Sequence, residues 1–512
     1  MLSRWVKDIS LTTPSLDNNT ADADRLCQAL QKETGIDHLS IDFELLNGLP
    51  DHLRKWNYQA RCLLFQDRGN SQVIGIGAID DPTPLLGVAV DLGTTRVVLR
   101  LLDLSTGKAL GETTFDNPQI TIGPDVLTRI HAAEVSKGLD YLSRLIRTGI
   151  AHELAVLCTQ LGYTPERIYL MTLAGNTAMT HLFLGLDPRW IIREPYIPVV
   201  NRPGVLKARQ LGFHLAPTAR VFVFPNIGSY FGGDLIAGIL FSELHRRETT
   251  AILVDVGTNA EVVLGNKNWL IACAGAAGPA LEGGVTCMGM TAGPGAIDRI
   301  RIDPKTFEMD IHTIDDAPPV GICGSGVIDL AAQLFLSGLI DIRGKLLPDA
   351  CPKRIRYQNE MAHLVVVSAK RSATGQALCI SQADLDSLIR SKAAMYTILE
   401  TLTATVGMTP RELDTFYVAG TFGSYIDPVS AITIGMIPDL PLTRYQSIGN
   451  SSLGGACRLL TDPSCMVEID NIRERITYLE LNVNQEFMNR FSAAKFIPHT
   501  TPELFPTVRR TG

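Results

Sequence analysis

The feature that most constrains this chain is a short pattern that occurs twice. In each copy an apolar strand leads into Asp-x-Gly-Thr, and a second apolar strand follows. The first copy, GVAVDLGTTRVVLRLLDL, begins at Gly87, and the second, AILVDVGTNAEVVLGN, begins at Ala251. Because internal repetition of a whole structural unit is typical of duplicated folds, the two aspartates, Asp91 and Asp255, are predicted to mark equivalent points of two similar lobes.

The elements that follow each copy support this duplication. In the first half, three strands precede a helical region from Pro124 to Leu161, and the strand RIYLMTLAG then ends at Gly175 before another helix. In the second half, three strands precede a Gly-rich insert from Gly275 to Gly326, a helix near Gln382 to Thr405, and a strand that ends at Gly420. The pattern predicts two β-β-β-α-β-α halves in an α/β fold, the second expanded on its loop side.

A smaller module precedes the duplication. The segment DPTPL, residues 81–85, contains two prolines, which disfavour both helix and central strand. Before it, ADADRLCQALQKETGI has helical spacing of apolar residues, and YQARCLLFQD and SQVIGIGAID are predicted to pair as strands. The sequence thus predicts a small α+β domain over residues 1–84, a first lobe over 85–250, and a second lobe with the insert over 251–512.

The composition narrows the partners. The 512 residues are 46% hydrophobic and 19% charged, with a net charge of −7, which is ordinary for a globular protein. No basic block indicates nucleic acid or an anionic membrane, and no apolar stretch reaches the length of a membrane span or a signal peptide. We therefore expect a cytoplasmic protein with a small-molecule or protein partner. The oligomeric state is left open, with a homodimer among the alternatives.

The ten cysteines do not form a metal-binding pattern. None occurs as C-x-x-C, so neither a zinc ribbon nor an iron–sulfur run can be assembled from their spacing. Scattered cysteines are usually buried small apolar residues. Cys273, Cys287 and Cys323 lie in Gly-rich stretches, where a functional thiol is the weaker alternative.

The repeated motif itself predicts an anion site. A tight turn of Gly and Thr exposes backbone N–H groups and hydroxyls, which suit phosphate oxygens. An aspartate just before the turn can hold hydrated Mg²⁺ or orient water. One copy alone would be read as a simple hairpin turn, but two copies favour a polyphosphate held from both sides. The candidate residues are Asp91, Gly93, Thr94, Thr95, Asp255, Gly257, Thr258 and Asn259.

These motifs resemble those of the acetate and sugar kinase, heat-shock chaperone and actin (ASKHA) superfamily, whose duplicated lobes are ribonuclease H-like. VDLGTT and VDVGTNAE are similar to its two phosphate motifs, and YVAGTFGSY to its adenosine motif. The helix GGDLIAGILFSEL would be the first connecting helix, with Asp234 at the position of the catalytic or water-orienting residue. The segment IGNSSLGGACRLL would be the second. The resemblance implies further nucleotide contacts at Asn176, Glu261, Gly420, Thr421, Phe422, Gly423 and Asn450.

Within that superfamily the chain resembles the ATP-dependent reductive activators of corrinoid proteins. Six segments carry this resemblance in order: NPQITIGPDVLTRI, LAGNTAMTHLFLG, NIGSYFGGDLIAGIL, AAGPALEGG, GMTAGPGAID and GICGSGVIDL. It implies ATP- and Mg²⁺-dependent restoration of Co(II) to Co(I) in a partner corrinoid protein that serves methyl transfer. The first 80 residues look like that family's middle domain.

The chain departs from this family's pattern in two ways. Members commonly carry a ferredoxin-type iron–sulfur domain, whereas these cysteines predict no cluster, so a separate ferredoxin-type donor is expected to supply the electron. Thr421 stands where the adenosine turn usually has a second glycine, and its Cβ is expected to crowd the nucleotide.

Other functions remain open from the sequence. A small-molecule kinase would share every nucleotide motif, and a nucleotide-gated scaffold would bind ATP without catalysis. The Gly-rich insert, together with residues 117–123, is hypothesised to face the corrinoid protein. The alternative is that the insert packs on its own lobe.

Overall fold

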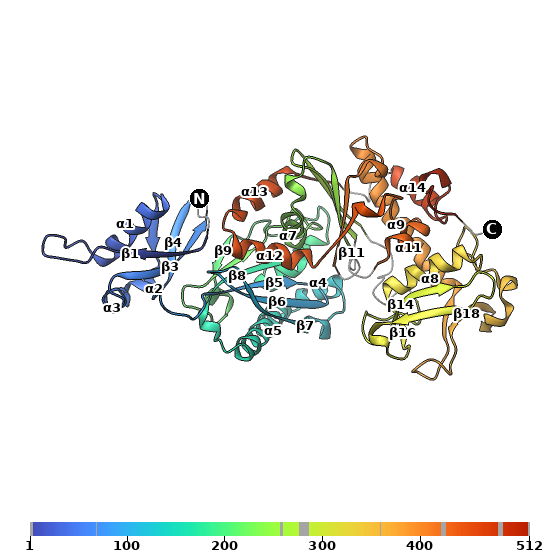
Figure 1. The fold of residues 1–512 in the computed structure, drawn as a ribbon, viewed down its shortest axis with the longest axis horizontal. Helices are drawn as coiled ribbons and strands as arrows, with labels where there is room; N and C mark the ends of the chain where they lie inside the picture. Colours follow the sequence, from blue (N-terminus) through green and yellow to red (C-terminus); the bar gives the residue numbers. More distant parts are fainter. Residues whose placement is uncertain are drawn as a thin grey trace. The chain divides into compact units, whose positions relative to one another are not determined.

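The computed structural model describes residues 4–67, 69–256, 260–275, 286–358, 360–420, 426–479 and 485–509 (Figure 1). The chain divides into two compact units. Unit 1 contains Met1–Phe241 and Ser451–Arg475, and unit 2 contains Ser242–Asn450 and Ile476–Gly512. Residues 451–475 therefore return to unit 1, although the sequence suggested one uninterrupted second lobe from residue 251 onward.

The beginning of unit 1 is a four-stranded sheet with the order β1-β3-β4-β2. The predicted helix is α1, Asp22–Thr34, which buries Leu26 and Leu30 in the core of this sheet and ends at Gly35 in the left-handed region. The predicted strand pair forms β3 and β4, which run antiparallel. The remaining elements are β1 (Val6–Ser10), β2 (Leu39–Ile41), α2 (Phe43–Leu46), α3 (Leu49–Lys55), β3 (Gln59–Asp67) and β4 (Asn70–Gly77).

The larger sheet of unit 1 has the order β7-β6-β5-β8-β10-β9. Three antiparallel strands, β7, β6 and β5, are joined by β8 and β10, which run parallel to β5. The strands β9 and β10 were not predicted, so this half contains two more strands than the sequence suggested. The strands are β5 (Leu86–Leu92), β6 (Arg96–Asp103), β7 (Ala109–Asp116), β8 (Ile168–Gly175), β9 (Val205–Lys207) and β10 (Arg220–Val223).

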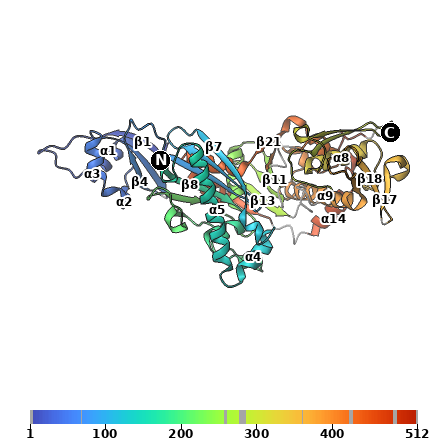
Figure 2. The same cartoon turned by 90° about the horizontal axis from the view of Figure 1, so that it is seen from below.

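The predicted helical region from Pro124 to Leu161 is two helices, α4 (Val126–Glu134) and α5 (Gly138–Gln160), which pack against each other (Figure 2). The break falls at Lys137, whose φ of 61° cannot continue a right-handed helix. A Cβ on Gly138 would lie 2.0 Å from the carbonyl oxygen of Ala132, so the chain needs glycine at this sharp change of direction.

Helices cover both faces of this sheet. Along β8, Met171 and Leu173 belong to the core shared with α5, whereas Thr172 between them donates to the carbonyl of Ala456 on α12 at 2.9 Å. Because successive strand residues point to opposite faces, α5 and α12 lie on opposite sides. The helices on this sheet also include α6 (Thr177–Leu184), α7 (Gly233–Ser242), α12 (Ser451–Thr461) and α13 (Cys465–Arg475).

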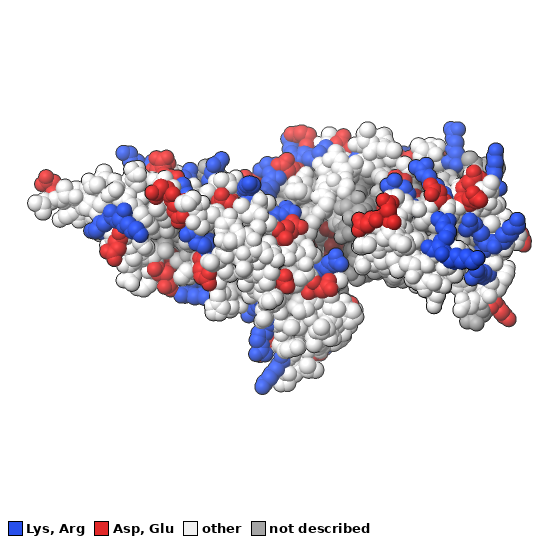
Figure 3. Space-filling model, turned by 60° about the horizontal axis from the view of Figure 1, so that its bottom comes forward, with Lys and Arg blue, Asp and Glu red and all other residues white. Residues whose placement is uncertain are grey.

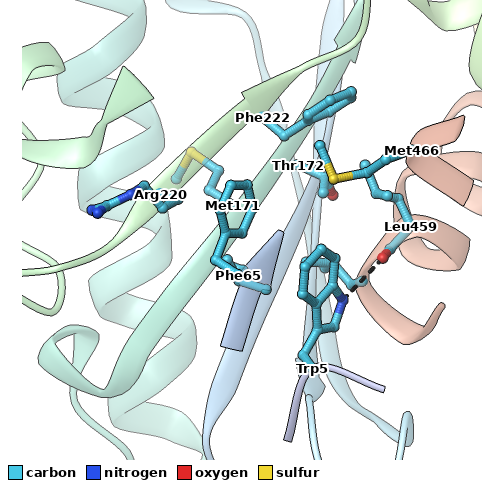
Figure 4. A pocket seen from close by; sticks show the side chains of 10 residues that line it. Trp5, Phe65, Met171, Thr172, Arg220, Phe222, Leu459 and Met466 are labelled. Carbon is cyan, nitrogen blue, oxygen red and sulfur yellow. Dashed lines mark hydrogen bonds between the residues drawn. The ribbon is translucent and has the colours of Figure 1, made fainter. Parts of the chain in front are cut away.

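The small sheet and the larger sheet of unit 1 meet around Trp5 (Figure 4). The Trp5 ring stacks on Phe65 with centroids 5.4 Å apart, and its N–H donates to the carbonyl of Leu459 on α12 at 3.2 Å. Met171 and Phe222 of the larger sheet line the same small apolar pocket. The pocket thus lies at a junction between packed layers.

The sheet of unit 2 has the order β21-β20-β11-β12-β13-β22. Its strands β13, β12 and β11 are antiparallel, and β20 and β21 run parallel to β11, as β8 and β10 do to β5. The duplicated fold is therefore confirmed, with β21 as the extra strand that matches β10. The strands are β11 (Ala251–Val256), β12 (Ala260–Gly265), β13 (Leu270–Gly275), β20 (Thr415–Ala419), β21 (Tyr445–Gly449) and β22 (Ile476–Tyr478).

The described part of the predicted Gly-rich insert, from residue 286, is folded. It contributes the sheet β15-β14-β16 and the start of α8, and a second sheet, β17-β18-β19, follows. Ile297, Ile300 and Ile322 are buried in the main core of unit 2, so this part packs on its own unit. Residues 276–285, which hold Gly278, Gly283 and Gly284, lie outside the described residues. The elements are β14 (Ala296–Ile302), β15 (Met309–Thr313), β16 (Gly321–Ile322), α8 (Gly324–Leu336), β17 (Ile355–Gln358), β18 (Met361–Val367), β19 (Leu378–Ser381), α9 (Gln382–Thr405), α11 (Pro428–Thr433) and α14 (Gln485–Ala494).

The surface of unit 2 gathers basic side chains near β17 and β18 (Figure 3). The segment at Lys353 and Arg354 precedes β17, while Lys370 and Arg371 follow β18, and the antiparallel pairing of the two strands brings these ends together. In the sequence these residues form two separate pairs and do not indicate a basic group. Among the described residues, no helix combines the length and apolarity needed to cross a bilayer.

Candidate functional site

The first predicted phosphate turn lies at the end of β5. Asp91 is half-buried there, and one of its carboxylate oxygens accepts from the Ser452 hydroxyl of α12 at 2.8 Å. A Cβ on Gly93 would lie 2.3 Å from the carbonyl oxygen of Arg96, so no larger residue fits this turn. Thr95 is exposed at the turn. The local structure is therefore a tight, glycine-dependent turn beside an ordered carboxylate.

Two hydrogen bonds donated by the buried residue Asn117 stabilise the turn. The Asn117 side-chain N–H donates to the carbonyl of Gly93 at 2.9 Å, and its backbone N–H donates to the carbonyl of Thr95 at 2.7 Å. Asn117 and Gln119 are both fully buried. The hypothesis that residues 117–123 face a partner is therefore wrong for these two side chains, because each is enclosed by its own unit and Asn117 shapes the turn.

Asn176 brings a second polar group to the turn. Its side-chain oxygen caps α6 by accepting from Met179 N–H at 2.9 Å, and its side-chain N–H donates to the Thr94 hydroxyl at 3.1 Å. The predicted contact residue Asn176 thus lies next to the predicted contact residue Thr94. The sequence placed them on separate motifs, and the parallel pairing of β5 with β8 joins them.

Asp234 belongs to the same cluster. It is the second residue of α7, and a Cβ on Gly232 would lie 2.5 Å both from the Cα of Asn176 and from a carboxylate oxygen of Asp234. The same oxygen accepts from Leu235 N–H at 2.9 Å. Gly232 therefore lets α7 begin in contact with the end of β8, which places the Asp234 carboxylate beside the turn region.

The second predicted turn lies at the equivalent end of the sheet in unit 2. Asp255 pairs directly with Glu261 across β11 and β12. Gly420 has a φ of 76°, and a Cβ there would lie 2.9 Å from an Asp255 carboxylate oxygen. Asn450 follows Gly449, which is in register with Ala419. The predicted residues Asp255, Glu261, Gly420 and Asn450 are thus brought to one sheet edge, whereas Gly257, Thr258, Asn259, Thr421, Phe422 and Gly423 lie outside the described residues.

Both clusters have the same origin. In each sheet the first strand and the two strands parallel to it end at the same edge, which is where ligands bind in open α/β sheets. Unit 1 supplies Asp91, Gly93, Thr94, Asn176 and Asp234 at this edge. Each cluster offers carboxylates together with glycine turns, which is the chemistry expected for a magnesium–phosphate ligand.

Ser452, Gly232 and Asn117 were not predicted as site residues. Ser452 lies within the quoted segment IGNSSLGGACRLL, and Gly232 directly precedes α7, so small residues at helix starts were the available signal. Asn117 follows a predicted strand and precedes a proline, a position typical of a cap.

The cysteines behave mainly as buried apolar groups. Burial raises the pKa of Cys273 to about 12, so it stays a neutral thiol at physiological pH. The Cys323 thiol donates to the carbonyl of Ile297 at 3.3 Å, and Cys287 is exposed. All ten cysteines are free, and within the described ranges no three His, Cys, Asp or Glu side chains group as a metal site would require.

Comparison with known families agrees with this architecture. Residues 249–509 match the family described as the C-terminal domain of RACo, the ASKHA domain. Residues 86–247 match the RACo middle region, and residues 5–81 match the RACo linker region. The expectation that the first 80 residues form the family's middle domain is therefore wrong, because they match the linker region and the middle region follows them.

Individual relatives point the same way. The chain is 31% identical over 431 residues to the corrinoid activation enzyme RamQ of Eubacterium limosum, covering 83% of this chain and 72% of the relative. It is 25% identical over 447 residues to a [Co(II) methylated amine-specific corrinoid protein] reductase of Methanosarcina barkeri, covering 79% and 76%. The solved structure of a reductive activator for corrinoid, iron-sulfur protein is 36% identical, with a TM-score of 0.87, and the match covers 99% of this chain and 81% of that one.

The duplicated sheets and their two motif edges define an ASKHA protein, a class whose fold binds nucleotides. Within that class, the chain belongs to the RACo family.

Proposed function

We propose that this protein is an enzyme that uses ATP to restore an inactive Co(II) corrinoid protein to the Co(I) state. The observation that carries the proposal is the match along 99% of the chain to a reductive activator for corrinoid, iron-sulfur protein. The two curated relatives are also named for corrinoid activation and for Co(II) corrinoid protein reduction. We expect the reaction to occur in the cytoplasm.

Nucleotide contacts are proposed at the motif edge of each unit. Gly93 and Gly232 allow the turn and the start of α7 to pack closely, since a Cβ would lie 2.3 Å from the carbonyl oxygen of Arg96 and 2.5 Å from the Cα of Asn176. The Thr94 hydroxyl at this turn is a proposed donor to the phosphate. Asp91 and Asp255 would bind Mg²⁺, which offsets phosphate charge when bound. The further proposed contacts are Asn176, Gly257, Thr258, Asn259, Glu261, Gly420, Thr421, Phe422, Gly423 and Asn450.

Asp234 is proposed to orient the water that attacks ATP. Its carboxylate lies beside Asn176, and a carboxylate near a phosphate turn can accept a proton from a bound water. Asp91 is a less suitable base because its carboxylate is proposed to contact Mg²⁺.

The redox step transfers one electron to the cobalt of the partner, and no covalent bond between the two proteins is required. The electron is proposed to come from a separate ferredoxin-type protein, which is oxidised as Co(II) is reduced to Co(I). If the potentials differ by about 200 mV, the transfer is uphill by about 5 kcal/mol. An ATP-driven change of conformation that favours one cobalt state of the partner would supply this free energy through differential binding.

We propose that the domain boundaries are residues 1–84, 85–250 and 251–512, with residues 451–475 packed on the first lobe. The insert, residues 275–326, is proposed to meet the corrinoid protein, and its residues 276–285, including Gly284, lie outside the described residues. Gly284→Val is expected to reduce capture of that protein while thermal stability and ATP affinity stay close to the parent. Loss of stability that explains the whole defect would favour packing instead.

The function is tested with a purified corrinoid protein in the Co(II) state. Its visible spectrum is followed after addition of this protein, MgATP and a reduced ferredoxin-type donor, and the expected result is conversion to Co(I) that requires all three. The same conversion without ATP would contradict the ATP-driven mechanism. No conversion, together with phosphorylation of a sugar or carboxylate, would favour a kinase.

A further inference from the structure

The most unusual buried side chain near the first turn is Arg129 on α4. It is fully buried, its Nε donates to the carbonyl of Gly123 at 2.8 Å, and its Nη1 lies 3.4 Å from the side-chain oxygen of Gln119. Its Nη2 is enclosed without a hydrogen-bond partner among the described residues. Burial lowers its pKa to about 10, so the guanidinium is still charged at neutral pH. The result is a buried cation whose acceptors are all neutral.

Such a cation is costly for the fold. A buried charge normally requires a counter-ion, and an apolar side chain of similar length would fill the space without that penalty. Asp125, the N-cap of α4, acts on Arg129 only through its field, and no described carboxylate forms an ion pair with it. Packing alone therefore gives a poor reason for arginine at this position.

One chain of contacts runs from Arg129 to the first turn through Gln119 and Asn117. The Gln119 side-chain oxygen accepts from Arg129, and the Gln119 backbone N–H donates to the Asn117 side-chain oxygen at 3.0 Å. Asn117 in turn donates to the carbonyls of Gly93 and Thr95. Both intermediate side chains are fully buried, so their positions are constrained by these bonds.

A second chain of contacts reaches the same turn through α6. Arg129 Nη1 also lies 3.4 Å from the sulfur of Met179, whose backbone N–H donates to Asn176 at the start of the helix. Asn176 then donates to the Thr94 hydroxyl. Arg129 thus contacts both chains of residues that lead to the turn, one through Gln119 and the other through Met179.

We propose that Arg129 is a positioning residue for nucleotide binding: it fixes the Gly93–Thr95 turn from both sides, and its unpaired positive charge favours an anionic polyphosphate there. The inference deepens the proposed function and rests on it. A pre-ordered turn pays less conformational entropy on binding, and a fixed buried charge acts over several ångströms through protein that screens weakly. The instability caused by the uncompensated cation is therefore expected to decrease when the anion is bound.

The test compares Arg129→Met, Arg129→Gln and Arg129→Lys in the full chain. Affinity for the magnesium complex of a non-hydrolysable ATP analogue is measured by calorimetry, and thermal midpoints are recorded with and without it. Arg129→Met and Arg129→Gln are expected to weaken binding about tenfold or more, because they remove the charge. Arg129→Lys is expected to recover part of this loss, because it keeps the charge without the planar fork.

Arg25 offers a matched control. It is 3% exposed on α1, and it also donates only to neutral acceptors, including Thr12 and the carbonyl oxygens of Asn18 and Thr20. It belongs to the small sheet and has no contact with the turn. Arg25→Met is expected to lower the thermal midpoint and to leave the affinity of the folded protein unchanged.

Parental affinity in Arg129→Met or Arg129→Gln, with only a fall in thermal midpoint like that of Arg25→Met, would overturn the proposal. Failure of every Arg129 variant to fold would also overturn it, because the role would then be structural. A parent chain that does not bind the analogue would contradict the proposed function itself, which distinguishes the two failures.

Discussion

The sheets of unit 1 and unit 2 share five strands in the same order, but they differ in what surrounds those strands. In unit 1 the additional strand, β9, lies next to β10. In unit 2 the additional strand, β22, lies next to β13, on the opposite side of the five shared strands. The first continues from β7 into α4 and α5, and the second continues from β13 into two further small sheets. What both keep is an aspartate at the end of the first strand and two parallel strands that end beside it. The shared part is therefore the part that the proposed chemistry needs.

The helices that follow β10 and β21 differ in the side chain at their second residue. Asp234 is the second residue of α7, and Ser452 is the second residue of α12. The two positions are equivalent in the duplication, yet one carries a carboxylate and the other a hydroxyl that donates to Asp91. This suggests a division of roles, in which Asp234 acts on water and Ser452 orders the carboxylate of Asp91.

The largest expected effect tests that division. Asp234→Asn should slow ATP hydrolysis by about 10²- to 10⁴-fold, because a positioned acid–base group contributes this much, and it should leave nucleotide affinity nearly unchanged. Ser452→Ala should slow hydrolysis only about tenfold, since it removes one hydrogen bond to a charged group. Steady-state hydrolysis and equilibrium binding of both variants provide the measurement. Parental turnover in Asp234→Asn would show that the assignment of this residue is wrong.

A second comparison concerns the crossing of α7 and α12. A Cβ on Gly455 would lie 2.1 Å from the backbone carbonyl oxygen of Ala237, whereas a Cβ on Gly454 would meet the ring of Phe241 at 2.5 Å. The Ala237 backbone lies within α7 and moves less readily than the ring of Phe241, which is a side chain near the end of that helix. Gly455→Ala should therefore lower the free energy of unfolding by about 3 kcal/mol, and Gly454→Ala by about 1 kcal/mol. Denaturant unfolding compares them, and equal losses would mean that the helix crossing adjusts as a whole.

The sequence predicted individual helices and strands better than the contacts between them. A helix was predicted near Gln382 to Thr405, and the structure has α9 over these residues, with a capping box formed by Ser381 and Asp384 at its start. The duplicated order of strands was also predicted, because strong apolar runs and Asp-Gly turns mark it. Contacts such as Ser452 with Asp91 join residues far apart in the chain, and no local pattern encodes them.

The elements that were missed share a physical cause. β10, β21 and the strands of the small sheets in unit 2 are two to seven residues long and lack a sustained period, so tertiary pairing decides them. The break between α4 and α5 depends on a single left-handed residue, Lys137. Asn117 has a polar side chain next to a proline, which favoured an exposed loop, but its buried hydrogen bonds to the first turn decided its position.

The two units also differ in their buried basic groups, which gives a pH prediction. In unit 2, His499 is 7% exposed, and burial together with the charge of Lys392 lowers its pKa to about 4. The unfolded chain, with an ordinary histidine pKa near 6.5, binds a proton between these values while the folded chain does not. Stability is therefore lost as pH falls from about 6.5 to about 4, by about 2 kcal/mol at pH 5.

His499→Asn should flatten this acid limb, because asparagine keeps an acceptor for the Thr501 N–H but does not titrate. His312 is a suitable control, since it is exposed and Asp298 raises its pKa, so its contribution has the opposite sign and is lost as pH rises. Denaturant unfolding at pH 4.5, 5.5 and 7 is measured for His499→Asn and for the control variant His312→Asn. An unchanged acid limb in His499→Asn would show that other groups cause the pH dependence.

The smallest expected effect concerns the glycines at the ends of β8 and β20, one at each motif edge. A Cβ on Gly175 would lie 2.8 Å from the backbone carbonyl oxygen of Leu92, whereas a Cβ on Gly420 would lie 2.9 Å from the carboxylate of Asp255. Gly420 also has a φ of 76°, and Gly449 at the end of the neighbouring strand has a φ of 62° with no atom within 4 Å of its Cβ position.

Gly420→Ala and Gly449→Ala should each cost about 1 kcal/mol of stability, because both force alanine into the left-handed region. Only Gly420→Ala is expected to weaken nucleotide binding, since only its methyl group displaces the carboxylate that we propose holds Mg²⁺. Thermal unfolding gives the common effect, and titration with the ATP analogue at several Mg²⁺ concentrations gives the difference. If both variants bind nucleotide like the parent, the contact between Gly420 and Asp255 serves the fold rather than the ligand, and the second edge would differ from the first in function as well as in its surroundings.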